Sequence, residues 1–289
     1  VLAWAGFRQV RTQSYVALHA YQASQGAAAA ALIRLVKRHI PLIVTLQEGK
    51  DLSAQSWLVR WTRAWVLRRA DRVVAISEFL ASYARGITKA PVEVIPNGVD
   101  IENFVFADPV SQPIVVTASR LVEKNNISNL LRAMACVRAH VPSVKLVVLG
   151  DGPLRRSLSE LALQQRVQDI VTWRGSASHD EVARCVGASR VFVRASKSEG
   201  LGNAFLEAMA SGVPVVASPV GGIVDFVVHE ETGLLAKPHD VSDIARQIVR
   251  LLTDDALYEK IRTNARRTVE ERYTWPSIAR ALQGVYDRY

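Results

Sequence analysis

The stretch that decides the fold is Ser198–Ser218, which reads SEGLGNAFLEAMASGVPVVAS. It opens with two glycines and continues through an alanine- and methionine-rich helical pattern over Asn203–Ala210. It ends in a continuously apolar run, Val213–Ala217. A strand that is apolar at every position is buried on both faces, which is typical of a parallel sheet with helices on each side. The order loop, helix, strand therefore predicts an α/β fold.

The same alternation of strand and helix runs through the rest of the chain. Helical patterns such as 127–139 and 153–165 separate short apolar runs. Strands are expected at 15–20, 41–46, 72–76, 92–95, 114–118, 145–149, 170–173, 191–193 and 213–217. Two sheets are needed to hold this many strands in 289 residues, so we expect two domains.

The boundary between the two domains is predicted at a connector over 97–112, rich in polar and turn-forming residues. We expect a first domain over 1–96 and a second over 113–272, followed by a C-terminal helix, 273–289, that packs back on the first domain. The first domain has four expected strands, whereas doubly wound domains usually have five or six. Because the chain opens at Val1 in the middle of a pattern, we expect either a fragment or a processed end.

Composition indicates a globular, soluble protein, with 49% hydrophobic and 22% charged residues. Two cysteines do not make a disulfide framework, and no apolar run is long enough to span a membrane, so we expect a cytoplasmic location. The net charge is +9, and the first 100 residues hold 13 Lys and Arg against six Asp and Glu. A basic first half suits phosphates, nucleic acid or an anionic membrane. Nucleic-acid binding ranks last of these because no recognition motif is present.

Two glutamates in the quoted stretch need an explanation. Glu199 precedes the helix, and Glu207 lies one turn inside it among apolar residues. A carboxylate accepts several hydrogen bonds, so sugar hydroxyls are suitable partners. The glycines place the N-terminus of the helix where a phosphate can bind. The alternatives are a solvent-facing glutamate with a local cation, and glycines that only permit tight packing.

The segment from Glu199 to Ser218 resembles the signature of the retaining family-4 glycosyltransferases of GT-B fold. The similarity extends to RADRVVAISEFLASYA, VEVIPNGVDIENF, SRLVEKNNISNLLRAM, LVVLGDGP and PVGGIVDFVVHEETGLLAKPHD, and covers about residues 15–289. The resemblance implies two Rossmann-like, doubly wound domains that face each other across a cleft, the first of them incomplete.

The resemblance also implies roles for the loop residues. Glu199 is expected to meet the hydroxyls of the donor sugar, and Glu207 the ribose of the nucleotide. The amides of Gly202 and Asn203 would face the diphosphate, and the base would be held by backbone groups at Gly175 and Ser176. The complete set of implied donor-binding residues is Gly200, Leu201, Gly202, Asn203, Glu207, Gly175 and Ser176.

Two cations follow the first strand of the second domain. Arg120 and Lys124 suit a diphosphate, and the resemblance gives an Arg and a Lys there the task of binding the donor's phosphates. With Glu199 they are the expected catalytic residues. In the family the Lys comes five residues after the Arg. That position is Asn125 here, and Lys124 comes one residue early. The alternative for both is a solvated surface cation.

In the first domain the segment VTLQEGKDL resembles a family segment that normally reads Thr-x-His-Gly-x-Asp, with Gln47 at the position of the histidine. That histidine helps to position the sugar, and Gln47 can hydrogen-bond but cannot carry a protonic charge. His19 is a second candidate for positioning the sugar, with a purely structural histidine as the alternative.

The expected activity is retaining transfer of a sugar from a nucleoside-diphosphate-sugar donor to a glycan, lipid-linked or small-molecule acceptor. Positioning and stabilisation of the departing diphosphate suffice for this chemistry, so no metal and no cofactor are expected. The alternative is a nucleotide-sugar-binding module without turnover, because the first domain is shortened.

An aromatic and basic helix adds one more hypothesis. Trp57, Trp61 and Trp65 are spaced four residues apart and share a side with Arg68 and Arg72. Tryptophan with arginine is typical of a membrane interface, so an anionic membrane surface is a candidate partner, at the inner face of the membrane. The alternative is an ordinary covering helix whose Trp rings pack on the sheet.

Overall fold

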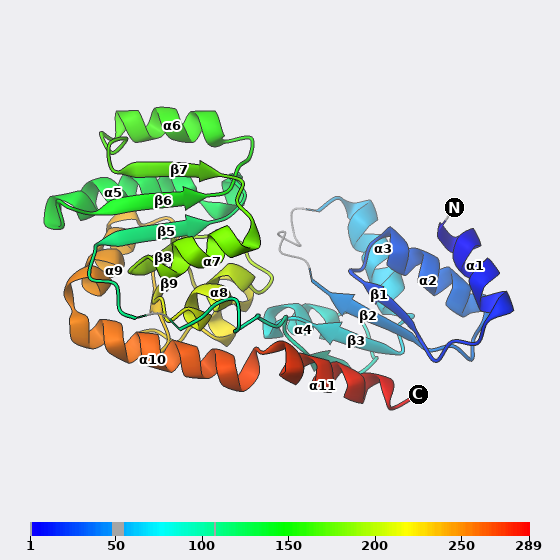
Figure 1. The fold of residues 1–289 in the computed structure, drawn as a ribbon. Coiled ribbons are helices and arrows are strands. Elements are labelled where there is room, and N and C mark those ends of the chain that lie inside the picture. The colour runs from blue at the N-terminus through cyan, green and yellow to red at the C-terminus, as the bar shows by residue number, and fades with distance from the viewer. Residues whose placement is uncertain (1, 48–54, 107) are drawn as a thin grey trace. The chain divides into compact units, whose positions relative to one another are not determined.

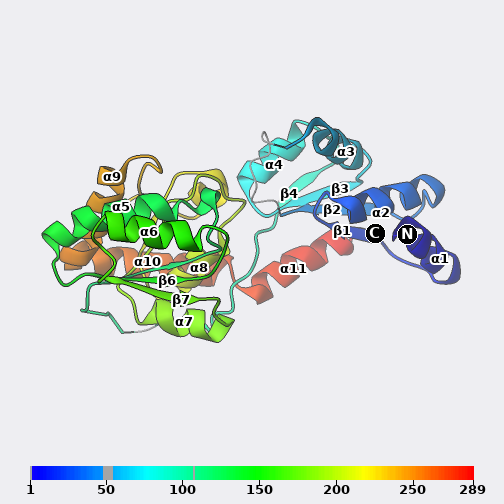
Figure 2. The same ribbon diagram turned by 90° about the horizontal axis from the view of Figure 1, so that it is seen from above.

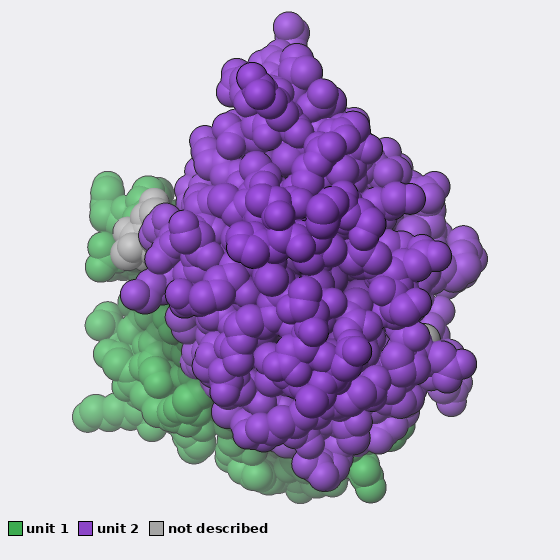
Figure 3. Space-filling view, turned by 90° about the vertical axis from the view of Figure 1, so that its left-hand side faces the viewer, with its two compact units in different colours: residues 1–97, 199–201, 276–289 green, residues 98–198, 202–275 purple. Residues whose placement is uncertain are grey.

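The computed structural model describes residues 2–47, 55–106 and 108–289. The chain divides into two compact units, which Figure 3 colours separately. The first comprises Val1–Asn97, Glu199–Leu201 and Pro276–Tyr289, and the second comprises Gly98–Ser198 and Gly202–Trp275.

The first unit is built on a parallel sheet whose strands run in chain order, β1-β2-β3-β4. The strands are β1 (Leu18–Tyr21), β2 (Leu42–Leu46), β3 (Arg72–Ala75) and β4 (Val92–Val94). All five residues of β2 are buried, as a central parallel strand requires. Because the order does not reverse among the described strands, right-handed crossovers place the connecting helices on one face of this sheet.

Among the described residues, five helices belong to the first unit (Figure 1). They are α1 (Leu2–Thr12), α2 (Gln25–Val36), α3 (Trp57–Leu67), α4 (Glu78–Arg85) and α11 (Trp275–Tyr286), the last of which joins this unit from Pro276 on. The face of the sheet opposite the crossovers is covered by α11, where Ile278 and Val285 pack against Ile43 and Val74. The last helix of the chain is therefore part of the first unit's core.

The second unit is a six-stranded parallel sheet of order β10-β9-β8-β5-β6-β7. Its strands are β5 (Ile114–Ala118), β6 (Lys145–Leu149), β7 (Val171–Gly175), β8 (Val191–Arg194), β9 (Val215–Ala217) and β10 (Leu234–Leu235). The order reverses between β5 and β8, which is the doubly wound arrangement.

Helices cover both faces of the second sheet (Figure 2). They are α5 (Ile127–His140), α6 (Arg155–Gln164), α7 (His179–Gly187), α8 (Asn203–Ala210), α9 (Val241–Thr253) and α10 (Asp255–Arg272). Side chains of α5, α6 and α9 form one core cluster with Val191 and Val193 of β8. Phe192 points to the other face and contacts Phe205 of α8 edge to face, with ring centroids 5.3 Å apart.

All nine expected strands are present, with ends shifted by at most three residues. The α/β class and the parallel sheets follow from the continuous apolar runs, as predicted. The sequence did not indicate β10, which is two residues long and pairs only with β9.

Candidate functional site

The predicted donor-site residues of the second unit lie on loops at the carboxyl ends of its strands. Arg120 follows β5, Gly175 ends β7 and Gly202 precedes α8. Open α/β sheets bind ligands where the strand order reverses, because the loops diverge there. In this sheet that point lies between β5 and β8.

The loops after β5 and β8 are fastened to each other. Nδ2 of Asn126 donates to the carbonyl oxygen of Ala195 at 2.8 Å, and the amide of Lys197 donates to the carbonyl oxygen of Lys124 at 2.8 Å. The ammonium of Lys197 also pairs with Glu123. These bonds hold the loop that carries Lys124 beside the start of the glycine loop.

Asn125, the position at which the resemblance places a lysine, has a structural role here. It lies in a single 3₁₀ turn, Glu123–Asn125, and its side chain is buried. Its Nδ2 donates to the carbonyl oxygen of Arg120 at 2.6 Å. Asn125 therefore fixes the loop that carries Lys124. Arg120 is exposed and Lys124 is half-buried, so both side chains are accessible to solvent.

Arg194, at the end of β8, has a role that the sequence analysis missed. Its guanidinium is buried, donates to the carbonyl oxygen of Ala118 at 3.1 Å and to the hydroxyl of Ser196 at 3.2 Å. It also lies 4.7 Å from the ring centroid of Phe205 in α8. One buried cation thus ties the end of β5 to the loop and helix that follow β8. A charged residue closing an apolar strand is the signal that could have identified it.

The glycine loop enters α8 through a left-handed backbone conformation that favours glycine. Gly202 has φ +94°, and an added Cβ would lie 2.9 Å from the side chains of Phe205 and Ile223. Gly202 is also the N-cap residue of α8 and has no side chain to cap it. Asn203 is exposed. The N-terminal end of α8 thus keeps the partial positive charge that attracts anions.

The residues just before Gly202 are buried. Glu199 is 6% exposed, Leu201 is buried and Gly200 is buried with them. Glu199–Leu201 belong to the first unit. A carboxylate with so little exposure needs hydrogen-bond donors around it.

Glu207 has a partner that the sequence did not indicate. Nε2 of His179 lies 3.4 Å from its Oε1, and the exposed fraction of the Glu207 side chain is 19%. Nδ2 of Asn103 lies 3.2 Å from Nδ1 of His179, whose ring meets Phe104 edge to face at 5.0 Å. Because the Asn103 amide donates to Nδ1, Nε2 carries the proton and donates to the carboxylate.

Two further glycines shape the ends of β6 and β7. Gly150 has φ +116°, and an added Cβ would overlap the carbonyl oxygen of Ser119. Gly175 has φ +71° and open space around it, and its carbonyl oxygen accepts from the amide of Gly150 at 2.6 Å. Ser176 is exposed beside it. The predicted base-binding residues therefore stand on an accessible strand end.

His19 and Gln47 belong to the first unit. Both ring nitrogens of His19 are engaged, Nδ1 with the hydroxyl of Tyr286 at 2.5 Å and Nε2 with that of Thr45 at 2.7 Å. Burial lowers the pKa of His19 below its ordinary value of 6.5. This geometry favours the structural alternative for His19. Gln47 follows β2 and donates to Oδ1 of Asn97 at 3.4 Å. The residues after it, 48–54, lie outside the described part of the chain.

Within the described ranges, no group of three or more His, Cys, Asp or Glu side chains is arranged to hold a metal ion. None of the described helices combines the length and the apolar character needed to cross a bilayer.

Two protein-family models match the chain. Residues 99–268 match the model of the glycosyl transferases group 1. The chain belongs to this family of glycosyltransferases. Residues 2–103 match the model of glycosyltransferase family 4, so the two models together span residues 2–268.

Among curated relatives is a GDP-mannose-dependent alpha-(1-6)-phosphatidylinositol monomannoside mannosyltransferase of Mycobacterium tuberculosis, 31% identical over 242 residues. That alignment covers 75% of this chain and 63% of the relative, so the chain spans less than two thirds of that protein's length. The N-acetyl-alpha-D-glucosaminyl L-malate synthase of Bacillus anthracis is 26% identical, with 93% of this chain and 74% of the synthase covered.

Solved structures confirm the predicted GT-B fold. The sucrose-phosphate synthase of Thermosynechococcus elongatus has a TM-score of 0.83 at 26% identity, covering 98% of this chain and 76% of the synthase. Anabaena HepE, solved with UDP and glucose, has a TM-score of 0.87 at 19% identity, covering 99% of this chain and 81% of HepE. The second of these likenesses concerns the fold alone.

Proposed function

We propose that the protein transfers a sugar from a nucleoside-diphosphate sugar to an acceptor hydroxyl with retention of anomeric configuration and without a bound metal. The observation that carries this proposal is the construction of the loop edge in the second unit. There, Arg120 and Lys124 stand on a loop fastened to the start of the glycine loop, and α8 begins directly after Gly202. Cations and the N-terminal end of a helix at one edge suit a pyrophosphate.

The roles of the side chains follow from charge. The bond between the sugar's anomeric carbon and the phosphate oxygen breaks, and a new bond forms to the acceptor oxygen. The acceptor's proton passes to the departing phosphate, which accumulates negative charge. Arg120, Lys124 and the first turn of α8 stabilise that charge, while Glu207 accepts hydrogen bonds from the ribose and Glu199 from the sugar.

One relative supports the proposed class of donor. The M. tuberculosis mannosyltransferase is GDP-mannose-dependent. The donor of this chain is accordingly proposed as a class, a nucleoside-diphosphate sugar.

The test begins with a thermal-shift screen of UDP-, GDP- and ADP-sugars, because a ligand that binds only the folded state raises its melting temperature. The donor that binds is then incubated with the protein and a chelator, and slow transfer of its sugar to water is followed by NMR. We expect nucleoside diphosphate to be released with chelator present and the sugar to appear first with the donor's configuration. Release of sugar with inverted configuration would overturn the proposed retention, and a requirement for added metal would overturn the proposed metal independence. Donor binding without turnover would favour a nucleotide-sugar-binding module.

We also propose that α3 contacts an anionic membrane surface. Trp57 and Trp61 are 77% and 58% exposed, so their rings do not pack on the sheet as the alternative required. Arg60 is exposed on the same helix, and Arg68 is exposed just after its end. Exposed tryptophans beside cations support binding at a lipid interface.

Liposome co-sedimentation tests this second proposal. We expect binding to vesicles of phosphatidylglycerol and not of phosphatidylcholine, and a loss of binding in the doubly substituted Trp57→Ala, Trp61→Ala chain. Equal binding to both kinds of vesicle would exclude it.

A further inference from the structure

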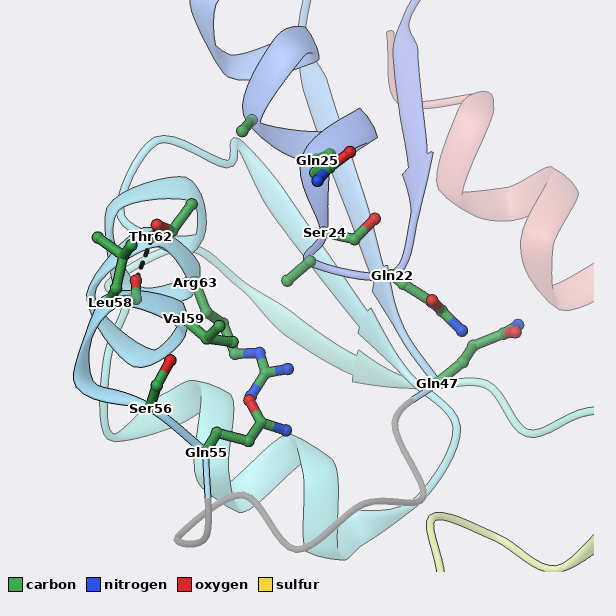
Figure 4. A pocket seen from close by; sticks show the side chains of 12 residues that line it. Gln22, Ser24, Gln25, Gln47, Gln55, Ser56, Leu58, Val59, Thr62 and Arg63 are labelled. Carbon is green, nitrogen blue, oxygen red and sulfur yellow. Dashed lines mark hydrogen bonds between the residues drawn. The ribbon is translucent and has the colours of Figure 1, made fainter. Parts of the chain in front are cut away.

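The first unit has a pocket at each end of its sheet. One of them, drawn in Figure 4, is bordered by Gln22 and Gln47, which follow the carboxyl ends of β1 and β2. The other has a volume of about 360 Å³ and lies at the amino ends of the same strands, between the ends of α1 and α2. It is lined by residues 10–15, which lead from α1 into β1, and by Lys37, His39 and Ile40, which lead from α2 into β2.

The pocket between α1 and α2 is basic. Arg11, Lys37 and His39 line it, and none of its lining residues, all of which the structure describes, is acidic. Within the described part of the chain, these three side chains have no hydrogen-bond or ion-pair partner. Arg38 is exposed beside them in the sequence. Two cations and an imidazole without partners, around one hollow, favour an anion.

The chain around this pocket carries positive charge only. Residues 2–47 contain no Asp or Glu. Their cations are Arg8, Arg11, Arg34, Lys37 and Arg38. The first acidic side chain that the structure describes is Asp71, and it is paired with Arg34 at 2.9 Å, outside the pocket. The bases that line the pocket therefore have no carboxylate beside them in the segment that forms it.

Exposed apolar side chains flank both walls of the pocket. Val16 directly follows the lining residues of the first wall and is 65% exposed. Leu35 and Val36 directly precede Lys37 and are 46% and 68% exposed. Apolar side chains beside cations are typical of a surface that enters the headgroup region of a bilayer. A soluble phosphate compound would make no use of them.

The ends of the helices offer a simpler explanation for two of the bases. Arg11 lies in the last turn of α1 and Lys37 directly follows α2, where a cation complements the partial negative charge of a helix end. That explanation requires neither a hollow between the helices nor His39 on its wall. It also gives no reason for the exposed apolar side chains on either side.

We infer that this pocket binds the phosphate of an anionic lipid headgroup, while Val16, Leu35 and Val36 enter the lipid surface around it. A second copy of the chain is a poorer partner, because it would bring the same positive charge to the interface. The pocket shares no residue with α3 or with the donor-site loops. The inference therefore assumes neither sugar transfer nor membrane contact through α3.

The experiment is co-sedimentation of the full chain with vesicles of equimolar phosphatidylcholine and phosphatidylglycerol, compared with vesicles of phosphatidylcholine alone. We expect binding to the anionic vesicles and little binding to the neutral ones, because the pocket attracts a negatively charged headgroup. Equal binding to both kinds of vesicle, or binding to neither, would overturn the inference.

The first pair of variants removes charge. In Arg11→Gln, Lys37→Gln both cations of the pocket are lost, and affinity for anionic vesicles should fall roughly tenfold or more, because each basic side chain near the surface contributes several-fold. The matched control is Lys145→Gln, Arg184→Gln, which removes two exposed cations of the second unit. Equal weakening by the control would show that net charge alone governs binding, and the pocket would not be the site.

The second pair of variants leaves the cations in place. Ser14 lines the pocket and is exposed, so Ser14→Glu adds a carboxylate there with little effect on folding. Ser143→Glu makes the same change in charge at an exposed turn residue outside the pocket. We expect vesicle binding to fall in Ser14→Glu only. A lower melting temperature in the Arg11 and Lys37 double variant, with vesicle binding unchanged in it and in Ser14→Glu, would mean that these cations serve only the helix ends.

Three further outcomes would assign the surface differently. Calorimetric binding of glycerol 1-phosphate that is weakened by Ser14→Glu, without any effect of this variant on vesicles, would assign the pocket to a soluble phosphate compound and overturn the lipid assignment. Dimerisation that is lost in Ser14→Glu, without vesicle binding, would assign it to a second copy of the chain. Vesicle binding that depends on Trp57 and Trp61 and not on the pocket would overturn this inference and leave the α3 proposal standing.

Discussion

Nε2 of His179 lies 3.4 Å from Oε1 of Glu207, and this is the one hydrogen bond that the described structure gives the Glu207 carboxylate. His179 is in turn held by Asn103 from a segment 76 residues earlier in the chain. The contact joins the first residue of α7 to the second turn of α8. It leaves the second carboxylate oxygen available for a hydroxyl of the donor.

The first prediction is that His179 positions Glu207. His179→Ala should weaken donor binding about two- to tenfold, which is the usual contribution of one hydrogen bond. His179→Gln should retain most of the affinity, because its amide can donate to the same oxygen. Calorimetry measures both, and a double-mutant cycle with Glu207→Gln tests the coupling. Tighter binding by His179→Ala would mean that the histidine competes with the donor.

The second prediction concerns the displaced lysine. Asn125→Lys restores the family's spacing but removes the 2.6 Å bond to the Arg120 carbonyl and places a charge at a buried position. We expect a loss of about 2–3 kcal/mol in the free energy of unfolding and no gain in donor affinity. Lys124→Met should instead weaken donor binding with little change in stability. Improved donor binding by Asn125→Lys would contradict the assignment of Lys124 to the phosphates.

The third prediction compares two glycines at neighbouring strand ends. Gly150→Ala forces Cβ against the carbonyl oxygen of Ser119 at φ +116°, and we expect it to cost about 3 kcal/mol or more. Gly175→Ala meets open space, so only its left-handed φ of +71° opposes it, at about 1 kcal/mol. Denaturant unfolding measures both, and equal losses would contradict the crowding at Gly150.

The fourth prediction concerns the stability of the first unit below neutral pH. The pKa of His19 is below 6.5 in the folded state because of burial, so at acidic pH the unfolded state binds more protons. The stabilisation is present above about pH 6.5 and is lost as the pH falls through the lowered pKa. His19→Gln should therefore flatten the fall in melting temperature between about pH 7 and pH 5. An unchanged slope would indicate that His19 titrates normally in the folded protein.

Much of the fold could be predicted from the sequence because parallel strands buried on both faces are continuously apolar, as in Leu146–Leu149 and Val215–Ala217. The two-residue strand β10 carries no comparable pattern. The glutamates at 199 and 207 could be singled out because they stand in a specific motif, and their roles stay a prediction. His179 was not, because a single exposed histidine at the start of a helix has no pattern around it.

The parts of the site that depend on long-range packing also escaped sequence reasoning. Arg194 reads as the end of an apolar strand, and only the fold brings it to the carbonyl of Ala118.

The most direct test of the donor site is calorimetric titration of the nucleotide sugar selected by thermal shift into the wild type, Glu207→Gln and the exposed control Glu271→Gln. We expect Glu207→Gln to weaken donor binding roughly tenfold or more, because a charge-assisted hydrogen bond to the ribose is lost. Glu271→Gln should bind the donor like the wild type. Equal donor affinity in all three proteins would contradict the proposed donor site.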